Sequence, residues 1–302
     1  MKKAQGMPFA LIFALIIGGV ILFLAIFFSG KMLGTGTYQK EAELTRSLDI
    51  LFNPMSSIRQ EGVTISRYYS LPEKANISFK CDAEKDSQTI SILLEKGKKP
   101  FAYAMQNKYI FSRSFDTKNL WIFGKPFEMP WRVDDMIFVV SRNYCFDSQN
   151  MPAGIKDELS ALNSSFIKIT TAAMISSKKC SGITVCFEKS GCDINVKYTL
   201  KEVRLRGKLA ASFLDDSTMY ALIFDPEEYD CNLKRLMKRL DFQADILLEK
   251  ASILESRGCY EAGGMRQELL GMKTAIANKD YLNIQSYAAN LKSKNIASCE
   301  LY

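Results

Sequence analysis

The feature that most constrains this chain is an apolar run near its N-terminus. From Met7 to Phe28 there are 22 residues without a charged or strongly polar side chain. A helix of that length rises about 1.5 Å per residue and can therefore cross the roughly 30 Å hydrocarbon core of a bilayer. Cleaved secretory signals are shorter and end at small residues, whereas this run ends at Phe27 and Phe28. The run therefore predicts an uncleaved transmembrane helix over 7–29, with a cleaved signal as the alternative.

The flanks of this run predict its orientation and a partner. Two lysines in the segment 1–6 favour a cytoplasmic tail, so the main domain is expected outside the plasma membrane, with the lipid bilayer as a partner. Ala10, Ala14 and Gly18 recur every four residues, a spacing that lets membrane helices pack closely. We expect self-association through this helix. The alternative is the ordinary alanine and glycine content of membrane helices.

The cysteines and the missing histidines narrow the chemistry. The cysteine count is even, no CxxC pair occurs, and all of the cysteines follow the apolar run, which favours disulfides outside the cytoplasm. The eight are Cys81, Cys145, Cys180, Cys186, Cys192, Cys231, Cys259 and Cys299. A chain with no histidine has no Ser–His–Asp triad, Cys–His pair or HExxH helix. We therefore expect no enzyme, no metal and no cofactor.

One catalytic alternative remains open, because it needs no histidine. An anchored hydrolase could use a Ser/Lys dyad or carboxylates. The adjacent residues Ser176, Ser177, Lys178 and Lys179 are the candidates for a dyad. The neighbours Asp134 and Asp135 are poor candidates for a carboxylate pair, because adjacent residues of a strand point to opposite faces.

The segment 30–61 is expected to be a neck followed by a juxtamembrane helix. Glycines at 30, 34 and 36 indicate flexibility, and Asn53-Pro54 is expected to kink or split the helix. An apolar seam at heptad spacing predicts either a helix that lies on its own domain or a coiled coil. The seam consists of Leu44, Leu48, Leu51, Met55 and Ile58.

The segment 62–224 predicts a β-rich exodomain. Short runs rich in Val, Ile, Thr, Phe and Tyr, from VTISRYYS to TMYALIF, alternate with turn residues. FAYAMQNKYIFS resembles a hairpin that turns at 106–108. Between the strands, Ile155, Leu159 and Leu162 share one helical face. We expect a mostly antiparallel sheet with one or two helices on a face.

The segment 225–302 predicts a helical bundle. Asp225 and Pro226 are typical of a helix start, and Gly258 is typical of a stop. Two shorter helices are expected near 262–277 and 280–297. The basic residues Lys234, Arg235, Lys238 and Arg239 are expected to form a solvated face, with contact to lipid headgroups or an acidic partner as the alternative. The fold class is thus α+β: a transmembrane helix, a mostly antiparallel β exodomain and an antiparallel helical bundle.

Candidate binding residues are few. Trp121, Phe127 and Trp131 could form an aromatic platform for a glycan or a Pro-rich peptide, although large aromatics more often serve the core. The expected partner is therefore an unknown protein or glycan. Asn76 and Asn163 begin N-glycosylation sequons. Beyond residue 30 the chain holds 38 basic and 33 acidic residues, a net charge of +5, which does not favour nucleic acid as a partner.

One disulfide pair follows from helix lengths. Cys259 lies at the end of the long helix, and the next two helices descend and climb by about 24 and 27 Å at 1.5 Å per residue. Cys299 therefore returns to the level of Cys259. Packed helices lie about 8–10 Å apart, a gap that loop ends can close, so we predict the pair Cys259–Cys299.

Two resemblances bear on function. The start MKKAQG, followed by a long apolar helix, resembles the N-terminus of type IV pilin-like proteins, which are trimmed after such a glycine, although Leu11 stands where those segments usually carry Glu. The layout also resembles archaeal-type single-pass membrane proteins that begin KK-x-Q and expose a cysteine-bearing domain, which implies no particular activity. The expected function is an anchored extracytoplasmic binding or structural protein of a cell-surface assembly. The alternative is a pilin-like subunit processed after Gly6.

Overall fold

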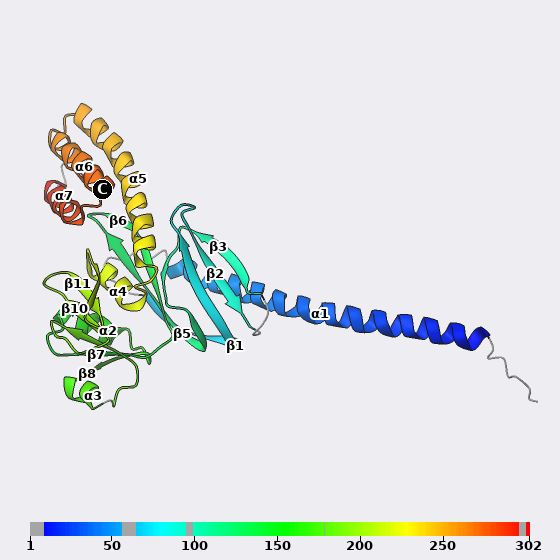
Figure 1. Ribbon diagram of the computed structural model, residues 1–302. Helices are drawn as coiled ribbons and strands as arrows, with labels where there is room; N and C mark the ends of the chain where they lie inside the picture. The colour runs from blue at the N-terminus through cyan, green and yellow to red at the C-terminus, as the bar shows by residue number, and fades with distance from the viewer. Residues whose placement is uncertain (1–8, 56–64, 95–98, 178, 296–299) are drawn as a thin grey trace, which may run out of the picture.

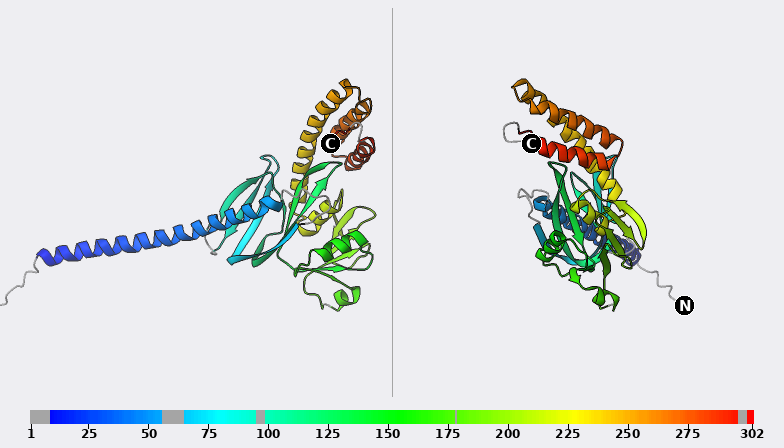
Figure 2. Two further views of the ribbon diagram at one scale, coloured as in Figure 1. Left: turned by 180° about the vertical axis from the view of Figure 1, so that it is seen from behind. Right: turned by 90° about the vertical axis from the view of Figure 1, so that its left-hand side faces the viewer.

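The computed structural model describes residues 9–55, 65–94, 99–177, 179–295 and 300–302, without the side chains of 9–12, 30–37, 54–55, 65 and 176. Helix α1 (Phe9–Met55) projects from a head made of two sheets and a helical bundle (Figure 1). Figure 2 shows the bundle on the side of the head that faces away from the projecting end of α1. The fold is α+β, as the sequence predicts.

Sheet A has the strand order β3-β2-β1-β5-β6-β4. Its pairs are antiparallel except for β4 with β6, which are parallel. The strands of sheet A are β1 (Ile65–Asp82), β2 (Ser87–Leu93), β3 (Phe101–Gln106), β4 (Tyr109–Phe111), β5 (Phe115–Glu128) and β6 (Arg132–Val140).

Sheet B has the strand order β12-β11-β10-β9-β7-β8. Three of its pairs are parallel, namely β7 with β8, β7 with β9 and β9 with β10. The expectation of a mostly antiparallel exodomain is therefore wrong for sheet B. The strands of sheet B are β7 (Tyr144–Asp147), β8 (Ile167–Thr170), β9 (Ile183–Phe187), β10 (Ile194–Lys197), β11 (Glu202–Leu205) and β12 (Lys208–Ser212).

The remaining helices cover the sheets and form the bundle. They are α2 (Ala153–Ala161), α3 (Ala172–Ser176), α4 (Asp216–Phe224), α5 (Tyr229–Ser256), α6 (Glu261–Ala277) and α7 (Tyr281–Lys294). Helix α2 is held in place by its buried residues Ile155 and Leu159, and Leu162 just after it is also buried. In the C-terminal bundle, α6 packs against α5, and α7 packs against α6.

Several local expectations differ from the structure. FAYAMQNKYIFS does not form a hairpin, because β3 pairs with β2 while β4 pairs with β6 at the opposite edge of sheet A. Asn107 does adopt the left-handed conformation of a turn, with φ 52°. TMYALIF is helix α4 and not a strand, because Asp215 and Thr218 form a capping box that starts a helix there.

Helix starts also differ from expectation. Asp225 does not cap α5, which begins at Tyr229, but ends α4. Its carboxylate accepts hydrogen bonds from the backbone N–H of Glu228 at 3.4 Å and from that of Ser112 at 3.1 Å. Helix α1 continues through 30–40 and through Pro54 to Met55, so the predicted flexible neck and kink are replaced by one helix. A glycine costs about 1 kcal/mol in a helix, which a helix of this length tolerates.

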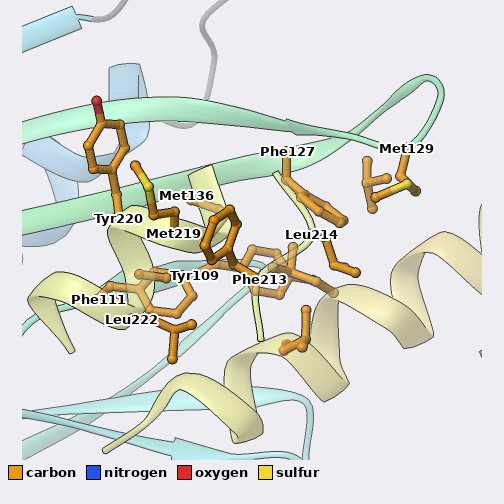
Figure 3. Close-up of a cluster of buried hydrophobic side chains, with 14 of the residues drawn as sticks. Tyr109, Phe111, Phe127, Met129, Met136, Phe213, Leu214, Met219, Tyr220 and Leu222 are labelled. Atoms are coloured by element: carbon orange, nitrogen blue, oxygen red, sulfur yellow. The ribbon is translucent and has the colours of Figure 1, made fainter. Parts of the chain in front are cut away.

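Two hydrophobic clusters hold the head together. The smaller lies between α1 and one face of sheet A. The larger joins the other face of that sheet to α4, sheet B and the bundle. Figure 3 shows part of the larger cluster, in which α4 contributes Met219, Tyr220 and Leu222. Because every residue of α4 except Asp216 is buried, this helix is the centre of the head.

Candidate functional site

The N-terminal half of α1 presents an apolar surface. Twelve large apolar side chains between Phe13 and Phe28 are 42–68% exposed. Among the residues that the structure describes, no helix is both long enough and apolar enough to cross a membrane. The transmembrane helix predicted over 7–29 therefore stays a prediction, and its first two residues lie outside the described part of the chain.

The C-terminal half of α1 packs on sheet A. Leu44, Leu48 and Phe52 are buried in the smaller cluster, where the ring of Phe52 lies 6.2 Å from that of Phe79. Glu41 is buried and accepts a hydrogen bond from the backbone N–H of Leu94 at 3.0 Å. The predicted heptad seam is thus a helix lying on its own domain. The side chain of Met55 and all of Ile58 lie outside the described residues.

The predicted helix-packing stripe lies on the projecting half of α1. Ala14 and Gly18 are exposed, and nothing lies within 4 Å of a Cβ built on Gly18. The side chain of Ala10 is not among those described. This face is therefore accessible in a single chain, and self-association through it stays a prediction.

A disulfide fastens the turn between β1 and β2 to α5. We call the turn residues 83–86 the hairpin tip. Cys81 at the end of β1 is bonded to Cys231 in the first turn of α5, with their Cα atoms 6.0 Å apart. The Cys81 N–H also donates to the carboxylate of Glu228 at 3.0 Å. Lys238 adds a hydrogen bond from its ammonium group to the backbone oxygen of Ala83 at 2.6 Å.

Arg235 is the buried centre of this contact. Its side chain is fully buried, and its guanidinium donates to the Asp86 carboxylate at 3.0 Å. It also donates to the backbone oxygen of Lys108 at 2.9 Å and to the side-chain oxygen of Asn232 at 3.0 Å. The guanidinium carbon lies 4.7 Å from the centre of the Tyr109 ring, a cation–π distance. Arg235 thus joins the tip, the edge of sheet A and α5.

The basic stripe of α5 is therefore not a plain solvated face. Besides Arg235 and Lys238, Lys234 pairs with Glu84 of the tip at 3.0 Å, and Arg239 lies 3.7 Å from Asp134. The stripe fixes one part of the chain to another that lies about 150 positions away in sequence. Sequence periodicity shows that such residues are exposed on an isolated helix, but it does not show what covers them.

The predicted aromatic platform is not present. Phe127 is fully buried in the larger cluster (Figure 3). Trp131 donates a hydrogen bond to Gln243 at 2.8 Å and packs near Tyr302. Trp121 packs beside Tyr68 of β1. It precedes Phe127 by six residues on β5, which corresponds to about 20 Å of extended strand. The length of β5 separates Trp121 from Phe127, whereas Trp131 lies in the turn after β5 and has its own contacts with Gln243 and Tyr302.

The other acidic and hydroxyl candidates do not converge in the described part of the chain. Asp135 pairs with Arg132, whereas Asp134 faces Arg239, so the two carboxylates point in different directions. Ser177 and Lys179 are exposed after α3, and Ser177 donates to the backbone oxygen of Met174. Lys178 and the side chain of Ser176 lie outside the described residues.

The described residues line a groove of 620 Å³ between α5 and the α6–α7 turn. Met237 and Ile276 give it apolar side chains, and Lys238 and Lys279 give it positive charges. A second groove, of 440 Å³, lies where Lys40 and Leu44 of α1 meet Tyr69 and Pro72 of β1. Neither groove contains the predicted aromatic or Ser/Lys residues.

Disulfides are confirmed for all seven cysteines that the structure describes. Besides Cys81–Cys231, the structure pairs Cys145 with Cys180 and Cys186 with Cys192. Cys259 is also disulfide-bonded. Cys299 lies outside the described residues, so the pair Cys259–Cys299 stays a prediction.

The described residues contain one cluster of metal-ligand type, formed by Cys81, Glu228 and Cys231. Both of its sulfur atoms are held in the disulfide, so they are not available as thiolate ligands. Asn76 and Asn163, which begin the two sequons, are exposed, on β1 and in the loop after α2. Their glycosylation stays a prediction.

Asp225 gives the head a pH dependence. Burial raises the pKa of Asp225 to about 6, and the neighbouring Glu228 and Glu227 carboxylates add to the increase. A raised pKa in the folded state means that the protonated acid stabilises the fold. This contribution is fully present below the ordinary pKa of 3.8 and is lost as the pH rises through 6.

We expect Asp225→Asn to remove this dependence. The loss amounts to about 2.5 kcal/mol between pH 4 and pH 7, since one pKa unit corresponds to about 1.4 kcal/mol. Urea unfolding at pH 4, 5, 6 and 7 should show stability falling with pH more steeply in the wild type than in the variant. Parallel pH profiles would contradict the assignment.

Three comparisons with known proteins give no match: no family model, no curated protein and no solved structure resembles this chain significantly.

Proposed function

We propose that this protein is a single-pass membrane-anchored subunit of a cell-surface assembly, acting by binding or support and not by catalysis. The observation that carries the proposal is the division of α1 into two halves. One half is buried in the smaller cluster, and the other exposes twelve large apolar side chains away from the head. An exposed apolar surface of this extent marks a site that lipid or another chain covers.

The energetics favour a bilayer as the cover. Burying a large apolar side chain contributes about 1.5–3 kcal/mol, so twelve of them correspond to about 20–35 kcal/mol at full burial. The apolar run in the sequence starts at Met7, before the described residues begin, and provides the full length that a span needs. We infer that 7–29 lies in the membrane with 1–6 on the cytoplasmic side.

The disulfides support a head outside the cytoplasm. Disulfides persist in oxidising compartments and are rare in the cytosol. Three pairs hold together β1 with α5, β7 with the segment before β9, and β9 with the loop before β10. The head is therefore a disulfide-stabilised domain that suits an extracytoplasmic location.

A second candidate function is a pilin-like subunit processed after Gly6. The observation that favours it is the continuity of α1, which runs from the apolar half into the head as one helix of 47 residues. A continuous helix lets the head and the apolar half move as one body, as a filament subunit requires. An anchor that only tethers a binding domain has no need of that rigidity.

The anchor can be tested by membrane retention. We expect the full-length chain to stay in the membrane after an alkaline carbonate wash. The double variant Ile17→Lys/Ile21→Lys should be released, because each central lysine costs about 2.5–3.5 kcal/mol on insertion. Ile50→Lys is the matched control, because Ile50 is also exposed on α1 but lies in the half that packs on the head.

The same preparations distinguish the two candidates. Release of the wild type by carbonate, or retention of the double variant, would contradict the anchor. The intact mass of the purified chain then decides between the functions, since a chain that begins at Met7 favours the pilin-like subunit. A chain that retains residues 1–6 favours the unprocessed anchor.

A further inference from the structure

The edges of the two sheets differ in how they are protected. A sheet edge exposes unpaired backbone N–H and C=O groups, which proteins normally protect with charges, prolines or a covering element. Four edge strands occur in the described residues. β4 is buried beside α5, β8 carries Lys168, and β12 carries Lys208. β3 contacts α1 but stays largely exposed, and unlike β8 and β12 it carries no charge.

Strand β3 has neither a charge nor a proline within its bounds, Phe101–Gln106. Ala102, Tyr103 and Ala104 are exposed. The pairing of β3 with β2 continues over six residues without a bulge, so the strand is regular along its whole length. Lys99 and Pro100 precede the strand and do not interrupt it. No strand of the described residues pairs with the outer edge of β3, so this edge can pair with one more strand.

The direction of β3 is fixed by its contacts with α1. At the start of β3, the ring of Phe101 lies 5.1 Å from that of Tyr38. Just past its end, the Lys108 ammonium donates to the side-chain oxygen of Asn53 at 2.5 Å. Both elements therefore run the same way, away from the apolar half of α1. The bond from the Leu94 N–H to Glu41 shows that β2 runs the opposite way.

This direction argues against a second copy of the chain as the added strand. Copies anchored in one membrane share the direction of α1, and therefore that of β3. Two β3 strands could then pair only in parallel, which is the less stable arrangement per residue. An antiparallel strand on this edge must run toward the membrane, as β2 does. The β3 strand of a second copy cannot meet this requirement, whereas a strand of a different protein can.

We propose that the outer edge of β3 binds an extended, uncharged strand of a second protein, antiparallel to β3. The chemistry of the occupant follows from β2, which already pairs with the inner edge. Ile90 and Ile92 of β2 are buried on the α1 side, whereas Ser91 between them lies on the open side. The occupant therefore alternates large apolar and small polar residues. Backbone hydrogen bonds to β3 provide the affinity. The alternation of apolar and polar residues in the occupant determines which of its side chains lie on the α1 side of the sheet and which lie on the open side.

The exclusion of a second copy and the direction of the occupant relative to the membrane rest on the proposed anchor, but the pairing itself does not. The test therefore uses the full-length chain in detergent micelles, where sidedness plays no part. The probe is a fluorescent peptide that copies residues 87–93, SQTISIL. We expect saturable binding by fluorescence anisotropy.

Two variants place the binding on this edge. Ala102→Lys/Ala104→Lys should weaken binding of the peptide at least tenfold, because lysines on an edge strand discourage added pairing. Ala210→Lys places the same charge on β12, another exposed edge strand, and should leave the affinity unchanged. Equal thermal melting of the three proteins shows that the head is folded in each.

Two results would overturn the proposal. One is the absence of saturable binding by the wild type or equal binding by the β3 lysine variant. The other is a wild-type dimer that the β3 lysines abolish while the peptide does not bind, which would assign the edge to a second copy. Either result leaves the membrane-retention test of the anchor unaffected.

Discussion

Replacing Arg235 with methionine is expected to lower the free energy of unfolding by about 3–5 kcal/mol. The change removes a fully buried guanidinium that donates to Asp86, to Asn232 and to the backbone oxygen of Lys108. Methionine fills much of the volume but leaves these acceptors without their donor. The acceptors at Lys108 and Asn232 are buried, and a buried acceptor without a partner costs about 1–3 kcal/mol, so these two losses accumulate. The Asp86 carboxylate is half exposed, so water can replace its donor.

The measurement is urea unfolding of the full-length chain in detergent, followed by tryptophan fluorescence. Lys234→Met is the matched control, because Lys234 is one position away and pairs with Glu84, but both side chains are exposed. An exposed ion pair contributes less than about 1 kcal/mol, so this control should unfold almost as the wild type does. Equal losses in the two variants would show that Arg235 does not hold the hairpin tip.

Removal of the Cys81–Cys231 disulfide, by Cys81→Ser/Cys231→Ser, is expected to cost about 4–5 kcal/mol. The bond joins residues 150 positions apart, so its loss frees a long loop in the unfolded chain. In the chain-entropy account, a longer loop gives a larger stabilisation. Thermal unfolding under non-reducing conditions should therefore show a much lower midpoint than the wild type.

The short disulfide provides the comparison. Cys186 and Cys192 are only six positions apart, so Cys186→Ser/Cys192→Ser should cost about 2–2.5 kcal/mol. If the short-loop variant is destabilised as much as the long-loop variant, the loop-length explanation fails. The contact of the tip with α5 would then depend on Arg235 and Lys238 rather than on the covalent bond.

The helices of the head could be predicted from the sequence, because their apolar spacing is a local signal. α6 and α7 lie close to the predicted ranges, and α2 buries Ile155 and Leu159 as predicted. Gly258 ends the long helix with φ 92°, a conformation that favours glycine. These features depend on residues within a few positions of one another.

Strand pairing could not be predicted in the same way. Strand β3 ends just before the turn at Asn107 and lies at one edge of sheet A, whereas β4 begins just after the turn and lies at the other edge. Contacts with residues far along the chain determine these two positions. One signal was available for sheet B. A helix between two strands is typical of a parallel crossover, and α2 connects β7 to the parallel strand β8 in this way.

The contact of the hairpin tip with α5 was missed because it is long-range. Lysines and arginines on a helix indicate an exposed face, and nothing near 234–239 in sequence predicts that Glu84 and Asp86 will meet them. The two roles considered for Phe127, a platform or the core, could not be separated for a related reason. Its neighbours in the larger cluster include Leu214, which is distant in sequence, so local pattern could not distinguish a buried phenylalanine from one that faces solvent.

The central claim is that the chain is anchored with its head outside, and the sidedness of its lysines tests it most directly. Intact cells are treated with a membrane-impermeant amine-reactive biotin, and labelled sites are mapped by mass spectrometry. Lys118 on β5 and Lys250 on α5 are both exposed on the head. The account predicts that both carry biotin before lysis, whereas Lys2 and Lys3, where retained, carry it only after lysis. Head lysines that label only after lysis would contradict the account.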